Sequence, residues 1–239
     1  MSKREEMRQR RQKEARRRQL IIIGGIAVVA IAVAGFFIAQ NIITNSQPVG
    51  SFVAVPTQTW PQADGTALGT KTAKVLVQEF ADFQCPICGE YFHNIEPQLI
   101  KDYVSTGKIR YEFHDYVVID QNVGGVESRH AAVASLCAND QGHFWDFHNM
   151  LYNNQQSEGS GTFSDKRLKA FAVALGLDAT AFNTCFDAQK YGSAVDADQV
   201  LGTGMGVQGT PTVFVNGTMA GNPLDYTALK QQIDLILGQ

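Results

Sequence analysis

The chain has 239 residues, of which 44% are hydrophobic, which suffices for one well-buried globular domain with an additional segment. Its net charge of −3 is the sum of two unlike parts. Residues 1–19 carry nine Lys or Arg against three acidic residues, and the remainder carries eleven basic against twenty acidic residues. A basic run directly before an apolar segment is typical of a membrane topology signal, so we expect no nucleic-acid partner.

An uncharged apolar run of twenty residues, Leu20 to Ala39, follows the basic tail. At about 1.5 Å per residue it spans a hydrocarbon core of about 30 Å. The alternative is a cleaved signal peptide, whose apolar region usually has about 7–15 residues. Ala32-Val33-Ala34 lies inside the run, but no clear cleavage site ends it. We therefore expect an uncleaved transmembrane helix at residues 20–43.

The basic residues also predict the orientation of this helix, because clusters of Lys and Arg remain on the cytoplasmic side. Residues 1–19 would form a cytoplasmic tail, and the acidic remainder would lie outside the cytoplasm. The protein would then be a single-pass protein of the cell membrane with an extracytoplasmic domain.

Residues 44–66 are rich in Thr, Gln, Gly and Pro and predict an extracytoplasmic linker, with a short strand at Ser51–Val55. The domain would occupy residues 67–239. Its first clear strand is Val75–Phe80, which is β-branched and apolar. A helix from Cys85 to Ser105, kinked at Pro97, and a second strand at Ile109–Val118 follow.

A block of helical patterns fills about residues 127–206. The candidate helices are Ser128–Asn139, His143–Tyr152, Ser164–Leu175, Thr180–Asp187 and Ser193–Leu201. Val213–Val215 and the turn Asn216-Gly217 then predict a hairpin, and Leu224–Leu237 an amphipathic helix. This order indicates an α/β fold with an inserted helical domain.

Two cysteines, Cys85 and Cys88, lie three residues apart at the predicted start of a helix, where backbone N–H groups and the helix dipole favour a thiolate. Pro86 suits the first helical position. A zinc site would need two further ligands, but the remaining cysteines are far apart and the five histidines form no tight cluster. We expect a redox-active pair that needs no metal and no other cofactor.

Two stretches resemble the DsbA-like branch of the thioredoxin superfamily: Glu79-Phe80-Ala81-Asp82-Phe83-Gln84-Cys85-Pro86-Ile87-Cys88 and Gly209-Thr210-Pro211-Thr212-Val213-Phe214-Val215-Asn216-Gly217. The resemblance runs from about Ala67 to the C-terminus and implies a thioredoxin-like fold. It implies that Cys85 attacks, that Cys88 resolves, and that Pro211 is a cis-proline facing them. The backbone of Thr210 would pair with an extended substrate peptide, near Pro86 and Ile87.

The same resemblance places a buried acid six residues before the first cysteine, where Glu79 stands. Burial would raise the pKa of this carboxyl, which could then exchange a proton with Cys88. The alternative is a surface acid at the end of a strand. Asp82 is a weaker candidate, expected to cap the following turn.

The other two cysteines, Cys137 and Cys185, fall on two predicted helices of the inserted block. An exported domain favours their oxidation, so we expect a structural disulfide; two buried free cysteines are the alternative. Phe144, Trp145 and Phe147 are expected to pack between helices, and the flanking histidines, His143 and His148, to lie at the surface.

The resulting hypothesis is a membrane-anchored thiol–disulfide oxidoreductase that oxidises cysteines of exported proteins and is reoxidised by a quinone-linked membrane partner, as the resemblance implies. Ile87 stands where relatives of this kind often have His, which leaves the direction of electron flow open. Potentials in the superfamily range from about −270 to about −120 mV. A reductase or isomerase, and a non-catalytic chaperone module, are the alternatives.

Overall fold

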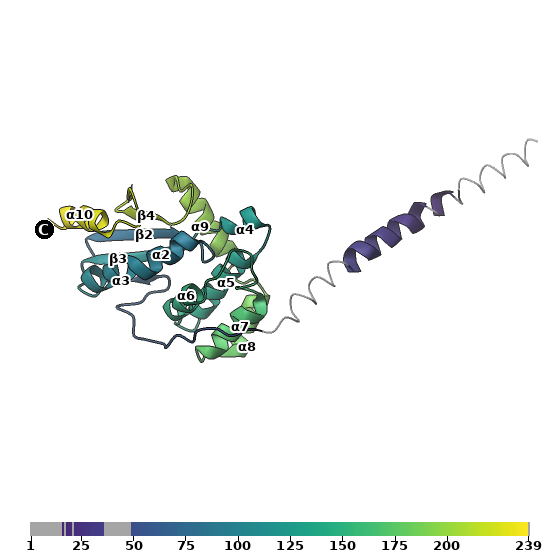
Figure 1. The fold of residues 1–239 in the computed structure, drawn as a ribbon, viewed down its shortest axis with the longest axis horizontal. Coiled ribbons are helices and arrows are strands. Elements are labelled where there is room, and N and C mark those ends of the chain that lie inside the picture. The colour runs from purple at the N-terminus through teal and green to yellow at the C-terminus, as the bar shows by residue number, and fades with distance from the viewer. Residues whose placement is uncertain (1–15, 17, 21, 36–48, 239) are drawn as a thin grey trace, which may run out of the picture. The chain divides into compact units, whose positions relative to one another are not determined.

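The structure, a computed structural model, describes residues 16, 18–20, 22–35 and 49–238, and the chain divides into two units, residues 1–48 and 49–239. In the described part of the first unit, Arg18–Gly35 is long and apolar enough to cross a membrane, by length and composition (Figure 1). Most of the predicted cytoplasmic tail, residues 36–43 of the predicted transmembrane helix and residues 44–48 of the predicted linker lie outside the described residues.

The centre of the second unit, within residues 49–238, is a five-stranded sheet in the order β1-β3-β2-β4-β5 (Figure 1). Its strands are β1 (Ala67–Leu68), β2 (Val75–Ala81), β3 (Ile109–Asp115), β4 (Thr212–Val215) and β5 (Thr218–Met219). The central strand β2 pairs in parallel with β3 and antiparallel with β4. Asn216 and Gly217, both with positive φ, form the predicted turn between β4 and β5.

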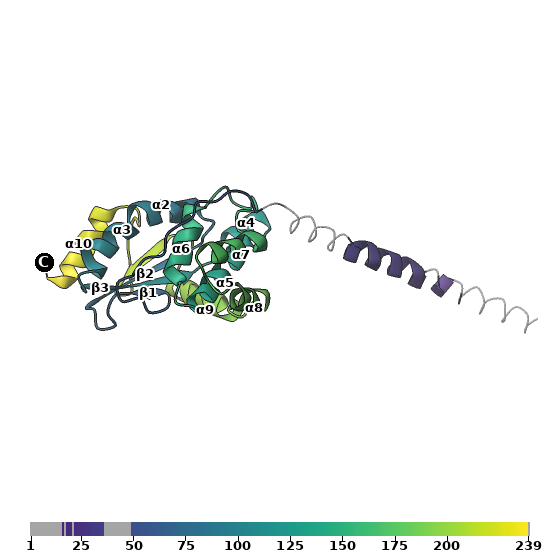
Figure 2. The ribbon, with the colours of Figure 1, turned by 90° about the horizontal axis from the view of Figure 1, so that it is seen from below.

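Helices lie between β2 and β3, between β3 and β4, and after β5. They are α2 (Pro86–Asn94), α3 (Glu96–Leu99), the π-helix η1 (Ile100–Val104), α4 (Ile119–Val123), α5 (Glu127–Asn139), α6 (Phe144–Asn153), α7 (Asp165–Ala174), α8 (Ala179–Asp187), α9 (Gly192–Met205) and α10 (Tyr226–Leu237). Figure 2 shows α2, α3 and α10 along one side of the sheet, where Tyr103 of η1 donates a hydrogen bond to Asp234 of α10 at 2.6 Å. This thioredoxin-like α/β architecture is the predicted fold class.

Successive side chains of β2 point to opposite faces of the sheet, so the strand contributes to two different cores. Val75 and Val77 are completely buried in the main cluster that includes α2 and α10 residues. Phe80 points to the other side, where it packs with Tyr116, Val207 and Phe214 in a separate cluster. Both faces of the strand are therefore covered, which accounts for its nearly continuous apolar sequence.

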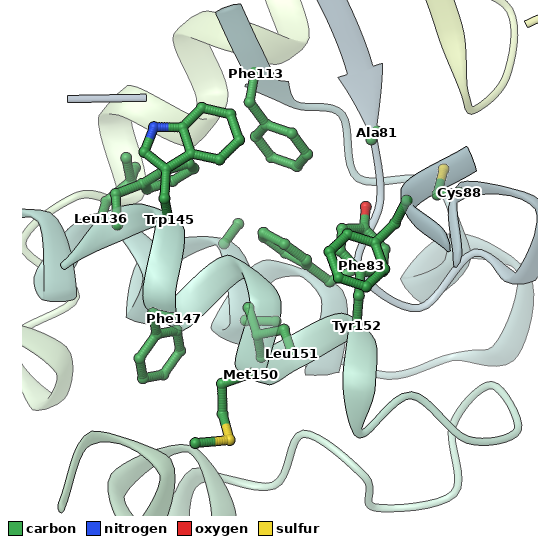
Figure 3. Packing of buried hydrophobic residues seen from close by; sticks show 14 of the residues in the cluster. Ala81, Phe83, Cys88, Phe113, Leu136, Trp145, Phe147, Met150, Leu151 and Tyr152 are labelled. Atoms are coloured by element: carbon green, nitrogen blue, oxygen red, sulfur yellow. The ribbon is translucent and has the colours of Figure 1, made fainter. Parts of the chain in front are cut away.

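The inserted helices form an aromatic core against the sheet. Figure 3 shows Phe83, Phe113, Trp145 and Tyr152 gathered between β3, α6 and the loop before α2. The surface position expected for His148 is wrong: its side chain is completely buried, with its ring 5.0 Å from that of Phe113. It occupies the same face of α6 as Phe144, Trp145 and Tyr152, so helix periodicity carries it into the core.

A disulfide joins Cys137 of α5 to Cys185 of α8, with an S–S distance of 2.01 Å and Cα atoms 5.8 Å apart. It ties two helices of the insertion that are 48 residues apart in sequence. A closed loop of this length stabilises a domain by roughly 2–4 kcal/mol. The bridge lies within the helical insertion, apart from the Cys85–Cys88 pair.

The expectation of a free linker up to residue 66 differs from the structure, because residues from Val49 onward pack on the domain. The backbone of Val53 exchanges two hydrogen bonds with the Asn154 side chain, at 2.7 and 2.9 Å. Trp60 donates its indole N–H to Asp146 at 2.9 Å. The strand expected at Ser51–Val55 is absent from this described segment, since side chains rather than a neighbouring strand satisfy its backbone.

Two further element boundaries differ from the sequence prediction. The single kinked helix from Cys85 to Ser105 is broken at Ile95 into α2, α3 and η1. Pro97 lacks an N–H group and its ring would clash with the carbonyl four residues earlier, which explains the break. Strand β3 ends at Asp115 instead of Val118, because the Val118 amide donates to the Asp82 carboxylate.

Candidate active site

Cys85 and Cys88 lie at the start of α2, where Cys85 is the N-cap residue and Pro86 occupies the first turn. Both cysteines are free thiols. Cys85 is 6% exposed and Cys88 is completely buried, at the edge of the aromatic cluster (Figure 3). A reagent can thus approach only the first sulfur, while the second is close enough to act on it from beneath.

The loop before β4 faces Cys85. Its Thr210–Pro211 peptide bond is cis, and the Cys85 Sγ donates a hydrogen bond to the Thr210 carbonyl at 3.3 Å. A surface cavity of about 450 Å³ follows this loop; its lining includes Gly206, Gln208, Gly209, Thr210, Pro211, Thr212 and Met219. Pro86 and Ile87 are exposed beside the thiols, and Ile87 is 44% exposed. Backbone groups and apolar side chains thus surround the accessible sulfur.

The two thiols have opposite pKa shifts. A hydrogen bond from the Cys88 thiol, with smaller contributions from the Thr210 side chain and from backbone N–H groups, lowers the pKa of Cys85 from 9.0 to about 6, although burial opposes this shift. Complete burial raises the pKa of Cys88 well above its ordinary value, and the charge of Cys85 adds to this effect. At neutral pH the pair therefore contains an accessible thiolate and a buried thiol, the division of roles that disulfide exchange requires.

Glu79 lies in β2 beneath the thiols and is 1% exposed. Its carboxylate accepts a hydrogen bond from the Tyr111 hydroxyl of β3. Burial raises the pKa of Glu79 from 4.5 to about 8, although the Tyr111 hydrogen bond lowers it. The structure thus places Glu79 as a buried acid and not as a surface residue at a strand end. A carboxyl that titrates near neutral pH can both take and give a proton.

One side chain that sequence reasoning passed over, Gln155, holds the loop before Cys85 in place. The Gln155 side chain donates to the carbonyls of Phe83 and Cys85, at 2.8 and 2.9 Å. Gly89 leaves the space for this amide, since a Cβ there would lie 2.2 Å from the Gln155 oxygen. Asp82, expected as a cap, accepts from the Gln84 amide at 2.8 Å. In the sequence, Gly89, directly after the second cysteine, was the one available sign that another group packs against this helix. Gln155 itself lies in a polar loop and gave no sign of its role.

Metal ligands do not gather near the thiols. Among the described residues, no group of three or more His, Cys, Asp or Glu side chains could hold a metal ion.

A thioredoxin-like fold that places such a thiol pair at a helix start, opposite a cis-proline, defines a thiol–disulfide oxidoreductase. The family model described as "Thioredoxin" matches residues 62–235. Disulfide bond formation protein D of Bacillus subtilis (strain 168) is 30% identical over 170 residues, which are 70% of this chain and 74% of that protein. The chain belongs to the thioredoxin superfamily, in its DsbA-like family, and is a protein thiol–disulfide oxidoreductase.

Solved structures agree with this assignment. Oxidised BdbD from Bacillus subtilis superposes with a TM-score of 0.66 at 28% identity, covering 78% of this chain and 100% of that one. Oxidised DsbA of Mtb superposes with a TM-score of 0.60 at 27% identity, covering 74% of this chain and 94% of that one.

Proposed function

We propose that this protein oxidises cysteine pairs of exported proteins while anchored in the cell membrane by its N-terminal helix. The observation that carries the proposal is the position of Cys85 at a helix start opposite the cis-proline, where the buried Cys88 thiol lowers the pKa of Cys85 to about 6. A stabilised thiolate favours the reduced enzyme, which makes the Cys85–Cys88 disulfide a stronger oxidant. The names of the relatives, disulfide bond formation proteins, support the same direction.

The reaction begins with the enzyme in its disulfide form. A substrate thiolate attacks the Cys85 sulfur, the Cys85–Cys88 bond breaks, and a mixed disulfide forms while Cys88 leaves as a thiolate. A second substrate thiolate then attacks the substrate sulfur of the mixed disulfide. The substrate disulfide forms, and Cys85 leaves as a thiolate that its low pKa stabilises. The substrate loses two electrons, and the enzyme gains them as a dithiol.

Glu79 has a role in this sequence because the Cys88 thiolate is buried when it is released. With a pKa of about 8, the Glu79 carboxyl is protonated at neutral pH and can give its proton to Cys88. In the return direction the carboxylate takes that proton back. The catalytic residues of the proposal are therefore Cys85, Cys88 and Glu79.

The loop opposite the thiols would bind the substrate. The backbone at Thr210 and Pro211 would pair with an extended peptide, and Pro86 with Ile87 would contact its side chains. Met219, 46% exposed, extends this apolar rim. Such a surface recognises extended backbone and apolar side chains rather than one folded shape, as substrates that are still folding require.

The anchor and its orientation complete the proposal. Residues 20–43 would cross the membrane, with residues 1–19 in the cytoplasm and the domain outside. A membrane redox partner that contains a disulfide would reoxidise the enzyme: the Cys85 thiolate attacks that disulfide, Cys88 resolves the mixed disulfide, and the partner gains two electrons.

The deciding measurement is the equilibrium potential of the Cys85–Cys88 couple against glutathione. We expect a value clearly above that of thioredoxin, toward the oxidising end of the superfamily at about −120 mV. A value near about −270 mV would instead support a reductase. In a parallel assay, Cys85→Ser should abolish oxidation of a reduced unfolded protein; unchanged oxidation would support a non-catalytic module.

A further inference from the structure

A second buried carboxyl lies near Glu79 and has no part in the reaction described so far. Glu96, in α3, is 2% exposed. One of its oxygens, Oε2, has no hydrogen-bond partner and lies 3.5 Å from the Nε2 atom of His148. Burying an acid costs free energy unless it is neutral or paired, so its presence in this core calls for a reason.

Tyr111 connects this carboxyl to Glu79. The Tyr111 side chain is completely buried, and its hydroxyl donates to Glu79. Burial raises the pKa of Glu96 well above its ordinary value, and the Tyr111 hydroxyl acts on the same carboxyl in the opposite direction. A hydroxyl has one proton to donate and two lone pairs that accept. It can therefore accept the proton of one carboxyl while it donates to the other.

Glu96 borders a surface cavity that is separate from the accessible thiol. It lines a cavity of about 410 Å³ with Gln58, Trp60, Phe92, Pro97, Ile100, Lys101, Ser105 and Asn149. None of Cys85, Ile87, Thr210 or Pro211 contributes to this lining. A substrate bound over Cys85 would leave the cavity open to water.

We propose that Tyr111 and Glu96 form a proton path from Glu79 to this cavity, which serves Cys88 while a substrate or partner occupies the Cys85 side. The proposal rests on the function proposed above. Cys88 and Glu79 are 0% and 1% exposed. Without a path, their protons could reach water only through local opening of the domain, which takes microseconds or longer.

The step is a shift of one proton. The Glu79 proton first moves to the Tyr111 oxygen while the Tyr111 proton passes to Glu96, and one proton leaves Glu96 for water in the cavity. As the Cys88 sulfur then attacks the mixed disulfide at Cys85, the Cys88 proton passes to the Glu79 carboxylate, the new S–S bond forms and the partner leaves as a thiolate. Reduction of the enzyme runs the path in reverse.

Other titratable groups face this path without interrupting it. Tyr91 of α2 lies beside Tyr111, and burial raises the pKa of its phenol well above the ordinary value. Burial lowers the pKa of His148 to about 3, which leaves its imidazole neutral beside Glu96. The hydroxyl of Tyr152 is buried without a hydrogen-bond partner. The neighbours are therefore uncharged at neutral pH.

The test measures how fast Cys88 resolves a mixed disulfide in the full-length protein. Reduced enzyme is mixed with oxidised glutathione, quenched with acid, and the glutathione adduct of Cys85 is followed by mass between pH 6 and 8. We expect Tyr111→Phe and Glu96→Gln each to slow its decay about tenfold or more and to flatten its dependence on pH. Tyr152→Phe, which removes a buried hydroxyl outside the path, should stay within about twofold of the wild type.

Thermal unfolding shows which variants are folded. If Tyr111→Phe does not fold, the rate measured for Glu96→Gln decides whether the path exists. Equal losses in Tyr111→Phe and Tyr152→Phe would indicate a general packing effect and overturn the path. If Glu79→Gln resolves the mixed disulfide slowly while Tyr111→Phe and Glu96→Gln keep wild-type rates and pH profiles, the path is overturned and the role proposed for Glu79 stands. Wild-type rates in all three would overturn both the path and the role proposed for Glu79.

Discussion

At the scale of single residues, two thiols separated by two residues acquire opposite properties. Cys85 is at the helix end, with the Cys88 thiol, backbone N–H groups and the Thr210 carbonyl around its sulfur. Cys88 is one turn further in and completely buried. The fold therefore separates attack from resolution by hydrogen bonds at Cys85 and by burial at Cys88, without a charged neighbour at position 87.

This separation predicts how the reduced protein reacts with iodoacetamide. Because only the thiolate is alkylated, the rate at Cys85 should rise with a midpoint near pH 6 instead of 9.0, while Cys88 stays unmodified. The Cys88 hydrogen bond is the largest cause of the shift, so Cys88→Ala should move the midpoint upward. Cys88→Ser, whose hydroxyl can still donate, should move it less. Equal midpoints in the two variants would contradict this account.

Glu79 should make stability depend on pH. Its pKa is about 8 in the folded chain against 4.5 ordinarily, so the unfolded chain loses a proton that the folded chain keeps. Stability should fall as the pH rises between these values. Glu79→Gln removes this titration, so it should raise the free energy of unfolding at about pH 8. The expected gain is a few kcal/mol, since a change of one pKa unit corresponds to about 1.4 kcal/mol. At about pH 4, where the carboxyl is protonated in both states, we expect no gain.

Urea unfolding of the reduced proteins measures this difference. Glu112→Gln is the matched control on β3, because hydrogen bonds from His114 and Arg110 hold the pKa of Glu112 below its ordinary value. The Glu112 carboxylate stabilises the fold at neutral pH, and this effect is lost in acid. Glu112→Gln should therefore lower the free energy of unfolding at neutral pH, opposite in sign to Glu79→Gln. A Glu79→Gln gain that is equal at both pH values would speak against a raised pKa.

At the scale of elements, the sequence predicted those parts whose signals are local. The strand at Val75, the helix starting at Cys85 and the hairpin at Asn216-Gly217 carry propensity, capping and turn signals in adjacent residues. The buried acid and the opposing Pro211 came from resemblance. Glu96 and Gln155 gave no such signal, because their roles depend on contacts between elements far apart in sequence.

The packing of α9 on the sheet offers a test with a control in the same helix. A Cβ at Gly202 would lie 2.7 Å from the Tyr116 ring and 3.0 Å from Phe80. Gly202→Ala should therefore destabilise the domain by about 1–3 kcal/mol. Gly204 has nothing within 4 Å, so Gly204→Ala should stabilise the helix by up to about 1 kcal/mol. Urea denaturation of both variants checks the prediction, and equal effects would contradict it.

At the scale of the whole molecule, the chain from Val49 to Trp60 is part of the domain and not a free tether. Arg167 donates to the carbonyls of Val49 and Ser51, at 2.8 and 3.2 Å, so the packed segment begins within a residue or two of the first unit's end. In sequence, the described part of the candidate membrane helix ends at Gly35, and the domain begins at Val49. The anchor would hold the enzyme near the membrane, where its redox partner is expected.

The proposed topology can be measured through the thiols of the protein itself. In intact cells treated with a reductant, a membrane-impermeant maleimide should label Cys85, because the domain would lie outside the cytoplasm. A Ser2→Cys variant in a Cys85→Ser background places a thiol in the proposed cytoplasmic tail and should be labelled only after the membrane is permeabilised. Labelling of position 2 in intact cells would reverse the orientation. Recovery of the protein from the medium, lacking residue 2, would instead indicate a cleaved signal peptide.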